Sequence, residues 1–307
     1  MDFLVRVLRN ALPHYFYVRL FEMPEIRRRA QAEQERLRVP LALASRNADL
    51  RNRHAGARCF ILCNGPSVKR QNVRQLKGEH VITVSSGYHH ADYEEIAPAY
   101  HCVPQLTYGL LTRADAIVWF REMHEKLGKA ILFLNYTEEP LVREEGLFPG
   151  RDVRYVAMDG SFADHPALAM PDIAQTIPAV QSVPLMALMV AMYMGLGPIY
   201  LLGTDHDHFR TGEYKYFFEP TVLKGKDSTV DEQGRIRAGG WFDELTGLAR
   251  LWGQYRSIKE IAVQNGVQII NATAGGELDE FPRADFDSLF SPVPAAQAAG
   301  DESSQGV

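Results

Sequence analysis

Short apolar runs alternate with polar and amphipathic stretches from residue 58 onward. Seven of these runs have the length and composition of buried strands. They span 58–63, 80–86, 99–104, 129–135, 153–158, 198–205 and 267–273. Between them, the pattern predicts helices over 112–128 and about 243–265, and a buried helix over 182–197 that ends at Gly195. Apolar strands that alternate with helices indicate an α/β fold with a mostly parallel sheet and helices on both faces.

The first 57 residues depart from this pattern, and we expect them to form a helical arm separate from the body. Apolar residues recur at helical spacing, with Arg6 and Arg9 between them: Phe3, Leu4, Val7, Leu8 and Leu12. Residues 1–58 hold twelve Arg and six acids, about +6, which leaves about −11 for the rest of a chain of net charge −5. A basic arm on an acidic body argues against nucleic-acid binding by the body. The arm is then a solvated helix, or it meets an anionic membrane surface or an acidic partner.

Two later segments also depart from the alternation. The segment 210–242 is long, polar and glycine-rich, and we expect it to be an active-site lid or to be disordered. The composition of 292–307 predicts a disordered tail. These limits leave residues 58–291 as the folded domain.

The cysteines and the hydropathy bear on the compartment. Three cysteines, Cys59, Cys63 and Cys102, suggest a reducing environment and no disulfide framework. No run of 18 apolar residues occurs, so neither a membrane-spanning helix nor a secretory signal is expected. We therefore expect a cytoplasmic protein, peripheral on the inner membrane if its arm docks there, and leave a homo-oligomer open.

Polar or glycine-rich stretches follow four predicted strands, at the edge of a parallel sheet where ligands bind. They are "NGPS" (64–67), "SSGY" (85–88), "GTDHDH" (203–208) and "NAT" (271–273). In the first, Asn64, Gly65, Pro66 and Ser67 predict a tight turn, either an ordinary one or one whose backbone N–H groups hold a phosphate. The dinucleotide fingerprint G-x-G-x-x-G and the P-loop G-x-x-x-x-G-K-[ST] are both absent from the chain.

The stretch "GTDHDHF" is the densest group of titratable side chains. Gly203 would let the backbone approach a ligand closely. Asp205 and Asp207 have the spacing of the acidic D-x-D pair that holds a divalent ion on a sugar-nucleotide diphosphate, and His206 and His208 alternate with them. His208 could act as a general base, because imidazole titrates near neutral pH. The alternative is a polar strand end in which an aspartate caps a turn.

Four further positions could meet an anionic ligand. Tyr214 and Tyr216, with Lys215 between them, offer a phenol or an ammonium group to a phosphate leaving group, or are ordinary loop aromatics. Ser182 opens the predicted buried helix, where it would form an anion-favouring corner or a simple cap. His89, His90 and His101 do not predict a metal site, because no residue that could complete the set of ligands lies at a suitable spacing from them.

Two blocks of this sequence resemble a known group of enzymes. "CNGPSVK" (63–69) and "SVPLMALMVAMYMGLGPIYLLGTD" (182–205) are similar to the bacterial sialyltransferases of glycosyltransferase family 42. They are still more similar to the motility-accessory-factor and 6-hydroxymethylpterin-diphosphokinase-like domains of the DUF115 group. The resemblance extends over roughly residues 58–290. It implies a single Rossmann-like domain with a small lid, and transfer of a nonulosonic acid from its CMP-activated form.

The resemblance also implies roles for particular residues. It sets the nucleotide and the sugar phosphate against Asn64, Gly65, Pro66, Ser67, Ser182, Gly203, Thr204 and Asp205. Ser85 stands where the sialyltransferases have an asparagine, and it joins this set. Tyr214 or Tyr216 would steady the departing phosphate.

The catalytic base is the main departure from the family. The sialyltransferases place their catalytic histidine in the lid, beyond the tyrosines, whereas this chain has no histidine after His208. The base is then His208 itself, His206, or a carboxylate such as Asp207, Asp243 or Glu244.

These inferences lead to an expected activity and two alternatives. We expect a bacterial glycosyltransferase that transfers a nucleotide-activated sugar, in the first place a CMP-linked nonulosonic acid, to a surface-glycan or flagellin acceptor. A CMP leaving group requires no cofactor, whereas a sugar-nucleoside diphosphate would call for Mg²⁺ or Mn²⁺ at Asp205 and Asp207. The alternatives are ATP-dependent diphosphate transfer to a hydroxymethylpterin and a catalytically silent partner protein.

Overall fold

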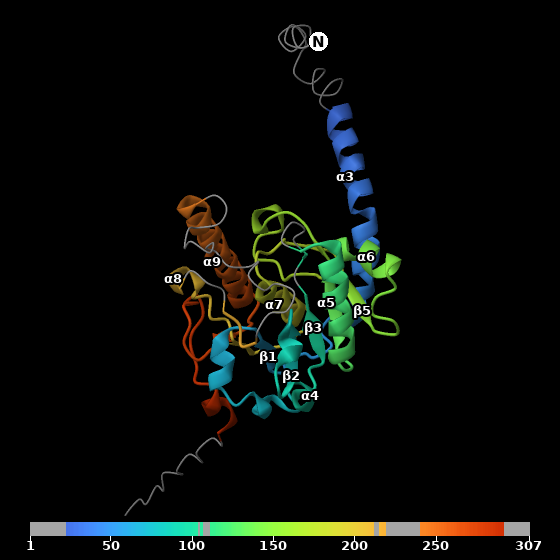
Figure 1. The fold of residues 1–307 in the computed structure, drawn as a ribbon. Helices are drawn as coiled ribbons and strands as arrows, with labels where there is room; N and C mark the ends of the chain where they lie inside the picture. The colour runs from blue at the N-terminus through green and yellow to red at the C-terminus, as the bar shows by residue number, and fades with distance from the viewer. Residues whose placement is uncertain (1–22, 104, 107–110, 212–214, 219–239, 292–307) are drawn as a thin grey trace, which may run out of the picture.

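A single parallel sheet forms the centre of the molecule (Figure 1). The computed structural model describes residues 23–103, 105–106, 111–211, 215–218 and 240–291, without the side chains of 23–31, 33 and 34. Within them the strands are β1 (Cys59–Leu62), β2 (His80–Val84), β3 (Tyr100–Cys102), β4 (Ile131–Asn135), β5 (Val153–Met158), β6 (Thr176–Ile177), β7 (Ile199–Leu202) and β8 (Ile269–Asn271). Their order in the sheet is β6-β5-β4-β3-β2-β1-β7-β8, and every neighbouring pair is parallel. The predicted α/β, Rossmann-like class is confirmed.

Helices connect most of these strands. In the described part of the chain the α-helices are α3 (Met23–Ala44), α4 (Tyr93–Ile96), α5 (Arg113–Lys126), α6 (Glu139–Glu144), α7 (Val183–Tyr193), α8 (His208–Thr211) and α9 (Trp241–Gln264). The seven predicted strands and the helices predicted over 112–128, 182–197 and about 243–265 are all present. Most are shorter than predicted, whereas α9 begins two residues earlier. The strand predicted over 198–205 ends at Leu202, because Gly203 turns the chain with a φ of +68°. The short strand β6 was not predicted, since two paired residues leave no periodic signal.

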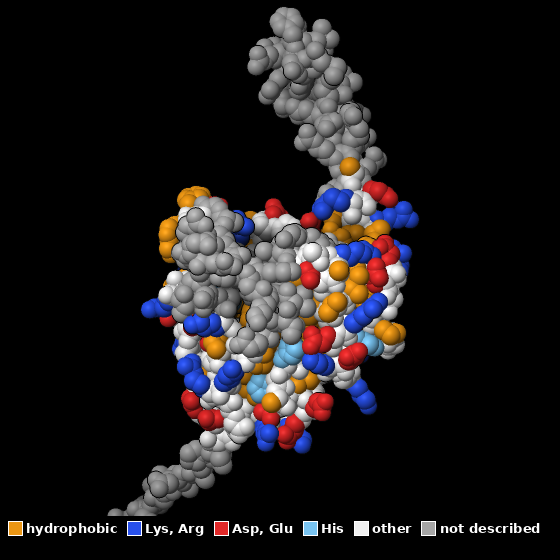
Figure 2. All heavy atoms as spheres, viewed as in Figure 1, with side chains coloured by type: hydrophobic (Ala, Val, Ile, Leu, Met, Phe, Trp, Pro, Cys, Tyr) orange, Lys and Arg blue, Asp and Glu red, His pale blue; other side chains and the backbone are white. Residues whose placement is uncertain are grey.

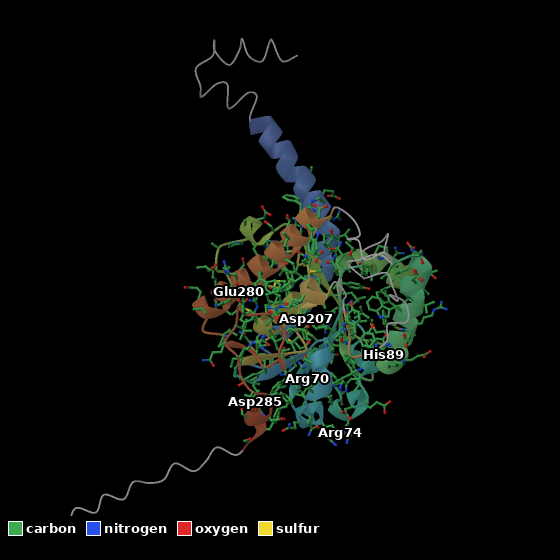
Figure 3. All side chains as sticks on the ribbon, turned by 60° about the vertical axis from the view of Figure 1, so that its left-hand side comes forward. Arg70, Arg74, His89, Asp207, Glu280 and Asp285 are labelled. Atoms are coloured by element: carbon green, nitrogen blue, oxygen red, sulfur yellow. The ribbon has the colours of Figure 1, made fainter. Side chains whose placement is uncertain are left out.

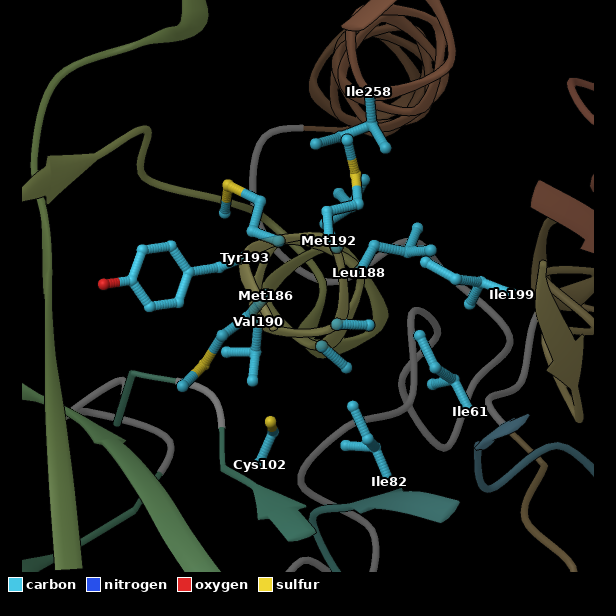
Figure 4. Packing of buried hydrophobic residues seen from close by; sticks show 14 of the residues in the cluster. Ile61, Ile82, Cys102, Met186, Leu188, Val190, Met192, Tyr193, Ile199 and Ile258 are labelled. Atoms are coloured by element: carbon cyan, nitrogen blue, oxygen red, sulfur yellow. The ribbon is translucent and has the colours of Figure 1, made fainter. Parts of the chain in front are cut away.

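The predicted buried helix α7 lies between the sheet and α9 (Figure 4). Its residues from Pro184 to Tyr193 are all buried, which explains why its sequence is apolar all round rather than on one stripe. Met186 and Val190 pack in the same cluster as Ile82 on β2, and Met192 shares this cluster with Ile258 on α9. The helix therefore holds the sheet and α9 at a fixed separation.

The apolar runs are continuous because both faces of the sheet are covered. In β1, Cys59 and Ile61 pack in the cluster of α7 and α9. Phe60 and Leu62 point to the opposite face, where Val68 and other residues of a second cluster cover them. Side chains of α5 and α6 cover the same opposite face further along, over β4 and β5.

The predicted arm is not separate from the body along its whole length. Residues 1–22 lie outside the described residues, but the end of α3 and the segment that follows it pack on the sheet. Leu50 is fully buried, and the buried Asn47 side chain donates to the carbonyls of Tyr155 and Ile173 at 2.8 and 2.9 Å. Arg36 pairs with Asp159 at 2.5 Å. The expectation of an arm separate up to residue 57 is therefore wrong, because these polar and apolar contacts tie its C-terminal part to the body.

Several expectations fall on residues that the structure does not describe. They concern Tyr214, most of the predicted lid at 210–242 and the tail at 292–307. The three cysteines are free and buried. Among the described residues, none of the helices combines the length and the apolar character that crossing a membrane requires.

Candidate functional site

The order of the strands brings two distant loops together. The chain leaves β1 towards β2, continues to β6, and returns to the other side of β1 as β7. Leu62 pairs with Leu202 at the carboxyl ends of β1 and β7, so the loops that begin at Asn64 and Gly203 leave the sheet side by side. In open parallel sheets this switch in strand order is where ligands bind.

A pocket that is partly open to solvent lies between these loops. Most of the residues singled out in the sequence line it: Asn64, Gly65, Ser85, Ser182, Gly203, Thr204, Asp205, Asp207, His208 and Tyr216. His206 and Lys215 line it as well. Pro66 and Ser67 are not on its wall, and Tyr214 lies outside the described residues. In Figure 3, Asp207 lies near the centre of the body, between α9 and α5.

Ser67 and Asp205 form the link between the two loops. The Ser67 hydroxyl donates to Oδ2 of Asp205 at 2.7 Å, and its backbone N–H donates to Oδ1 at 3.1 Å. Burial raises the pKa of Asp205, and these two hydrogen bonds act in the opposite direction. Ser67 therefore supports the site from behind rather than contacting a ligand, and it caps no helix, since Gly65 precedes the short 3₁₀ turn Pro66–Arg70.

The two glycines of these loops are required by close packing. A Cβ on Gly65 would lie 1.8 Å from Asp205 Oδ2 and 2.6 Å from the Gly203 carbonyl oxygen. The Gly65 N–H donates to that carbonyl at 2.9 Å. At Gly203 the positive φ and a Cβ position 2.6 Å from Val68 Cγ2 both exclude a side chain. These positions therefore bring the two backbones together without room for any larger residue.

His208 lines the pocket, and Glu244 lies behind it within ion-pair distance. His208 begins α8 and is 3 % exposed, and its Nε2 is 3.4 Å from Oε1 of Glu244 in the first turn of α9. Burial lowers the pKa of His208, whereas the carboxylates of Glu244 and Asp207 act to raise it. At neutral pH the imidazole of His208 is therefore neutral, and the Glu244 carboxylate would stabilise its protonated form. Among the carboxylates considered as an alternative base, Glu244 lies within ion-pair distance of His208, and Asp207 also acts on the pKa of His208.

His206, Tyr255 and Ser182 form a second polar chain beneath the pocket. His206 Nε2 is 2.7 Å from the Tyr255 hydroxyl, and burial lowers the pKa of His206 to about 4. Tyr255 is fully buried; burial raises its pKa well above the usual range, and the Ser182 side chain acts to lower it. Ser182 makes no side-chain cap at the start of α7, so its hydroxyl serves this chain instead. Sequence reasoning missed Tyr255, because it lies on the buried stripe of α9 and looks like any core aromatic.

The remaining wall combines polar and aromatic groups. Asn64 is 9 % exposed, and its buried Oδ1 has no hydrogen-bond partner among the described residues. Its carbonyl accepts from the N–H of Phe217 at 3.0 Å, which holds the segment 215–218 over the pocket. Tyr216 stacks on Phe218 with ring centres 5.4 Å apart. The hydrogen bond between Asn64 and Phe217 therefore joins the two segments from which Asn64 and Tyr216 reach the pocket.

Ser85 and Thr204, which line the pocket, each contact a buried residue of a neighbouring segment. Ser85 has a φ of +49°, and its carbonyl is 2.8 Å from Nε2 of the buried His101. The hydroxyl of Thr204 is 2.9 Å from that of Thr273, in the stretch that follows β8. The stretches after β1, β7 and β8 thus contact one another, and Ser85 from the stretch after β2 lines the same pocket.

The acidic pair does not fit a chelated metal ion as it stands. Both oxygens of Asp205 accept hydrogen bonds from Ser67, which leaves this carboxylate little freedom to approach a cation. Among the described residues, no group of three His, Cys, Asp or Glu side chains is placed to hold a metal ion. The ring of His101 lies between the Thr83 hydroxyl and the Ser85 carbonyl, so it belongs to the core.

Comparison with protein-family models and with curated proteins gives no match for this chain. The resemblance to the sialyltransferases and to the DUF115 group therefore rests on the two sequence blocks described above. One of these blocks forms the turn after β1, and the other forms α7 and β7. Both blocks thus lead to the pocket.

Proposed function

We propose that this chain is a glycosyltransferase that transfers a nucleotide-activated sugar, in the first place a CMP-linked nonulosonic acid, to a surface-glycan or flagellin acceptor. The observation that carries the proposal is the His208–Glu244 pair, 3.4 Å apart, at a pocket built where the strand order reverses. A neutral imidazole beside a carboxylate is suited to take a proton from an acceptor hydroxyl. The position of the pocket is the one at which open parallel sheets bind nucleotides.

The donor set favours a nucleoside monophosphate as the leaving group. A sugar-nucleoside diphosphate needs a cation to neutralise its two phosphates, and Asp205 is engaged by Ser67 instead. A single phosphate can be stabilised by neutral groups, such as the Asn64 amide, the Tyr216 phenol and nearby backbone N–H groups. Lys215, which also lines the pocket, adds one positive charge.

The proposed reaction needs one proton transfer and one departing phosphate. The oxygen of the acceptor hydroxyl attacks the anomeric carbon of the donor sugar, and His208 accepts the proton of that hydroxyl. The bond between the anomeric carbon and the oxygen of the CMP phosphate breaks, and CMP leaves. Glu244 stabilises the imidazolium that forms. General-base assistance of this kind contributes about 10²–10⁴-fold to the rate. Ser182, held by Tyr255, would lie at the sugar–phosphate corner.

We place this reaction in the cytoplasm, on the inner face of the membrane. Three free, buried thiols are typical of a protein from a reducing compartment. Activated sugars of this kind would be supplied by a nucleotidyl transfer in the same compartment.

A thermal-shift series tests the proposal. The protein is mixed with CMP, UDP or ATP, each with EDTA and with added Mn²⁺ or Mg²⁺. We expect CMP to raise the melting temperature equally with and without EDTA. A response to ATP with Mg²⁺ alone would favour a diphosphokinase, and a response to none of the nucleotides would favour a silent partner protein. Asn64→Ala, in which the buried amide is lost, should reduce the CMP response and serves as the matched variant.

A further inference from the structure

An apolar patch lies at the N-terminal end of α9, on the helix turn that also carries Glu244. It consists of Trp241, Phe242 and Leu245, which are 64, 78 and 59 % exposed, and we call it the tip patch. Figure 2 shows hydrophobic side chains gathered at this end of α9, at the upper left of the view. Large apolar side chains are seldom exposed together on a soluble protein unless something covers them.

The tip patch is an extension of the stripe that buries α9. Trp241 and Leu245 are on the same side of the helix as Trp252 and Tyr255, since four, seven and three residues separate successive members. Tyr255 is fully buried in the core, and the exposure of the stripe increases towards its N-terminal end. The sequence therefore continues a buried-type pattern beyond the place where the described body covers it.

The surroundings of the tip patch favour a lipid surface over a protein groove. All three side chains are more than half exposed on a helix end rather than in a groove, so they can enter the apolar layer of a bilayer together. Tryptophan and phenylalanine are the residues that anchor peripheral proteins at the level of the lipid headgroups.

Charge on the same end of the molecule points to anionic lipid. Figure 1 and Figure 3 both show α3 rising from the end of the body to which the N-terminal end of α9 points. The sequence of α3 holds five arginines and three glutamates, and Arg38 is 76 % exposed along its side chain. The acidic body would be repelled by an anionic bilayer, so contact is expected at this basic end only.

We propose that the tip patch inserts into an anionic lipid bilayer while the basic helix α3 lies against the same surface. Because Glu244 is on the same turn as the tip patch and contacts His208 on the pocket wall, insertion would bring the pocket close to the bilayer. If the function proposed above holds, the acceptor is then carried on a lipid; this last step rests on that function, whereas the docking does not.

Flotation of the full chain with vesicles of phosphatidylglycerol and phosphatidylethanolamine tests the docking in the absence of nucleotide. We expect Phe242→Ser to lower the partition coefficient about tenfold, and a Trp241→Ser, Phe242→Ser, Leu245→Ser triple variant to lose most of the binding. Val263→Ser is the control, because Val263 is 73 % exposed at the opposite end of the same helix and should leave binding unchanged. At 0.5 M NaCl the contribution of α3 falls, but the difference between Phe242→Ser and the wild type remains.

Tryptophan fluorescence gives a second readout. Vesicles should shift the emission of the wild type to shorter wavelength, and Trp241→Phe should lose this shift while it keeps its binding. Unchanged flotation of the triple variant would overturn the proposal. So would a wild-type dimer that the triple variant dissociates, which would make the tip patch a contact between copies. If the triple variant melts at a lower temperature but still binds vesicles, the chain itself covers the tip patch. That result would also overturn the proposed docking.

The docking and the proposed function fail separately. The tip-patch variants should keep the full thermal shift with CMP, because none of their side chains lines the pocket. Loss of vesicle binding with an intact CMP response supports the docking, whatever acceptor is used.

Discussion

Ser67 donates two hydrogen bonds to the carboxylate of Asp205, at 2.7 and 3.1 Å, across 138 residues of sequence. This contact joins the turn after β1 to the turn after β7, and the pocket lies against it. Both partners are buried, with Ser67 1 % and Asp205 6 % exposed. The shape of the candidate site therefore depends on a polar contact that no ligand needs to touch.

Gly65→Ala tests how closely these turns must approach. The added methyl group would lie 1.8 Å from Asp205 Oδ2, so one of the turns must move. We expect the free energy of unfolding in urea to fall by about 1–3 kcal/mol, and the thermal shift with CMP to disappear. Gly253→Ala is the matched control, since nothing lies within 4 Å of its Cβ in the middle of α9. It should stabilise the protein by about 0.5–1 kcal/mol, and equal losses in the two variants would refute the argument.

His208→Ala and Glu244→Gln separate the roles of the pair. Without the imidazole we expect the rate of sugar transfer to fall about 10²–10⁴-fold, while the thermal shift with CMP stays near that of the wild type. Glu244 acts to raise the pKa of His208, so Glu244→Gln should move the acidic limb of the pH–rate profile to lower pH. Full turnover in His208→Ala would exclude it as the base, and an unmoved limb in Glu244→Gln would exclude the coupling.

The stability of the protein should fall in acid through His206. Its pKa is lowered to about 4 in the folded state, mainly by burial, from about 6.5 in the unfolded chain. Folding then favours the neutral ring, so this contribution is complete above pH 6.5 and is lost as the pH falls towards about 4. His206→Asn, which also tolerates the φ of +46°, should lose less stability between pH 7 and pH 4.5 than the wild type.

Urea unfolding at several pH values checks this prediction. The difference should persist in 0.5 M NaCl, because burial rather than exposed charge is its main cause. A wild-type profile no steeper than that of His206→Asn would contradict it. His101 is also buried, and its pKa of about 3 leaves a residual acid dependence in both proteins.

Tyr255→Phe tests the polar chain beneath the pocket. The change removes one hydroxyl and leaves His206 Nε2 and Ser182 without their shared partner. We expect the free energy of unfolding to fall by about 1–3 kcal/mol, with a smaller CMP-induced thermal shift. In the Tyr255→Phe background, Ser182→Ala should reduce the CMP response little further, because the two residues act together. Additive losses would mean that Ser182 contributes independently of Tyr255.

The sequence by itself determined seven of the eight strands of the sheet and the loops that border the site. A strand covered on both faces must be apolar at every position, so Cys59–Leu62 and Ile199–Leu202 stand out from the polar turns that follow them. The carboxyl ends of parallel strands share one edge of the sheet, so those turns were expected to meet. The pattern of strand ends singles out Asn64 and His208, and the start of the predicted buried helix singles out Ser182.

Only the tertiary structure decided which of these residues face each other. The position of β7 beside β1 pairs Ser67 with Asp205, and no local pattern in the sequence encodes that neighbourhood. Glu244 reaches His208 because α9 packs on α7, and Tyr255 becomes a polar link although its spacing is that of a core residue. Side-chain partners from distant segments depend on strand order and helix packing, which are set by the cooperative burial of the whole core.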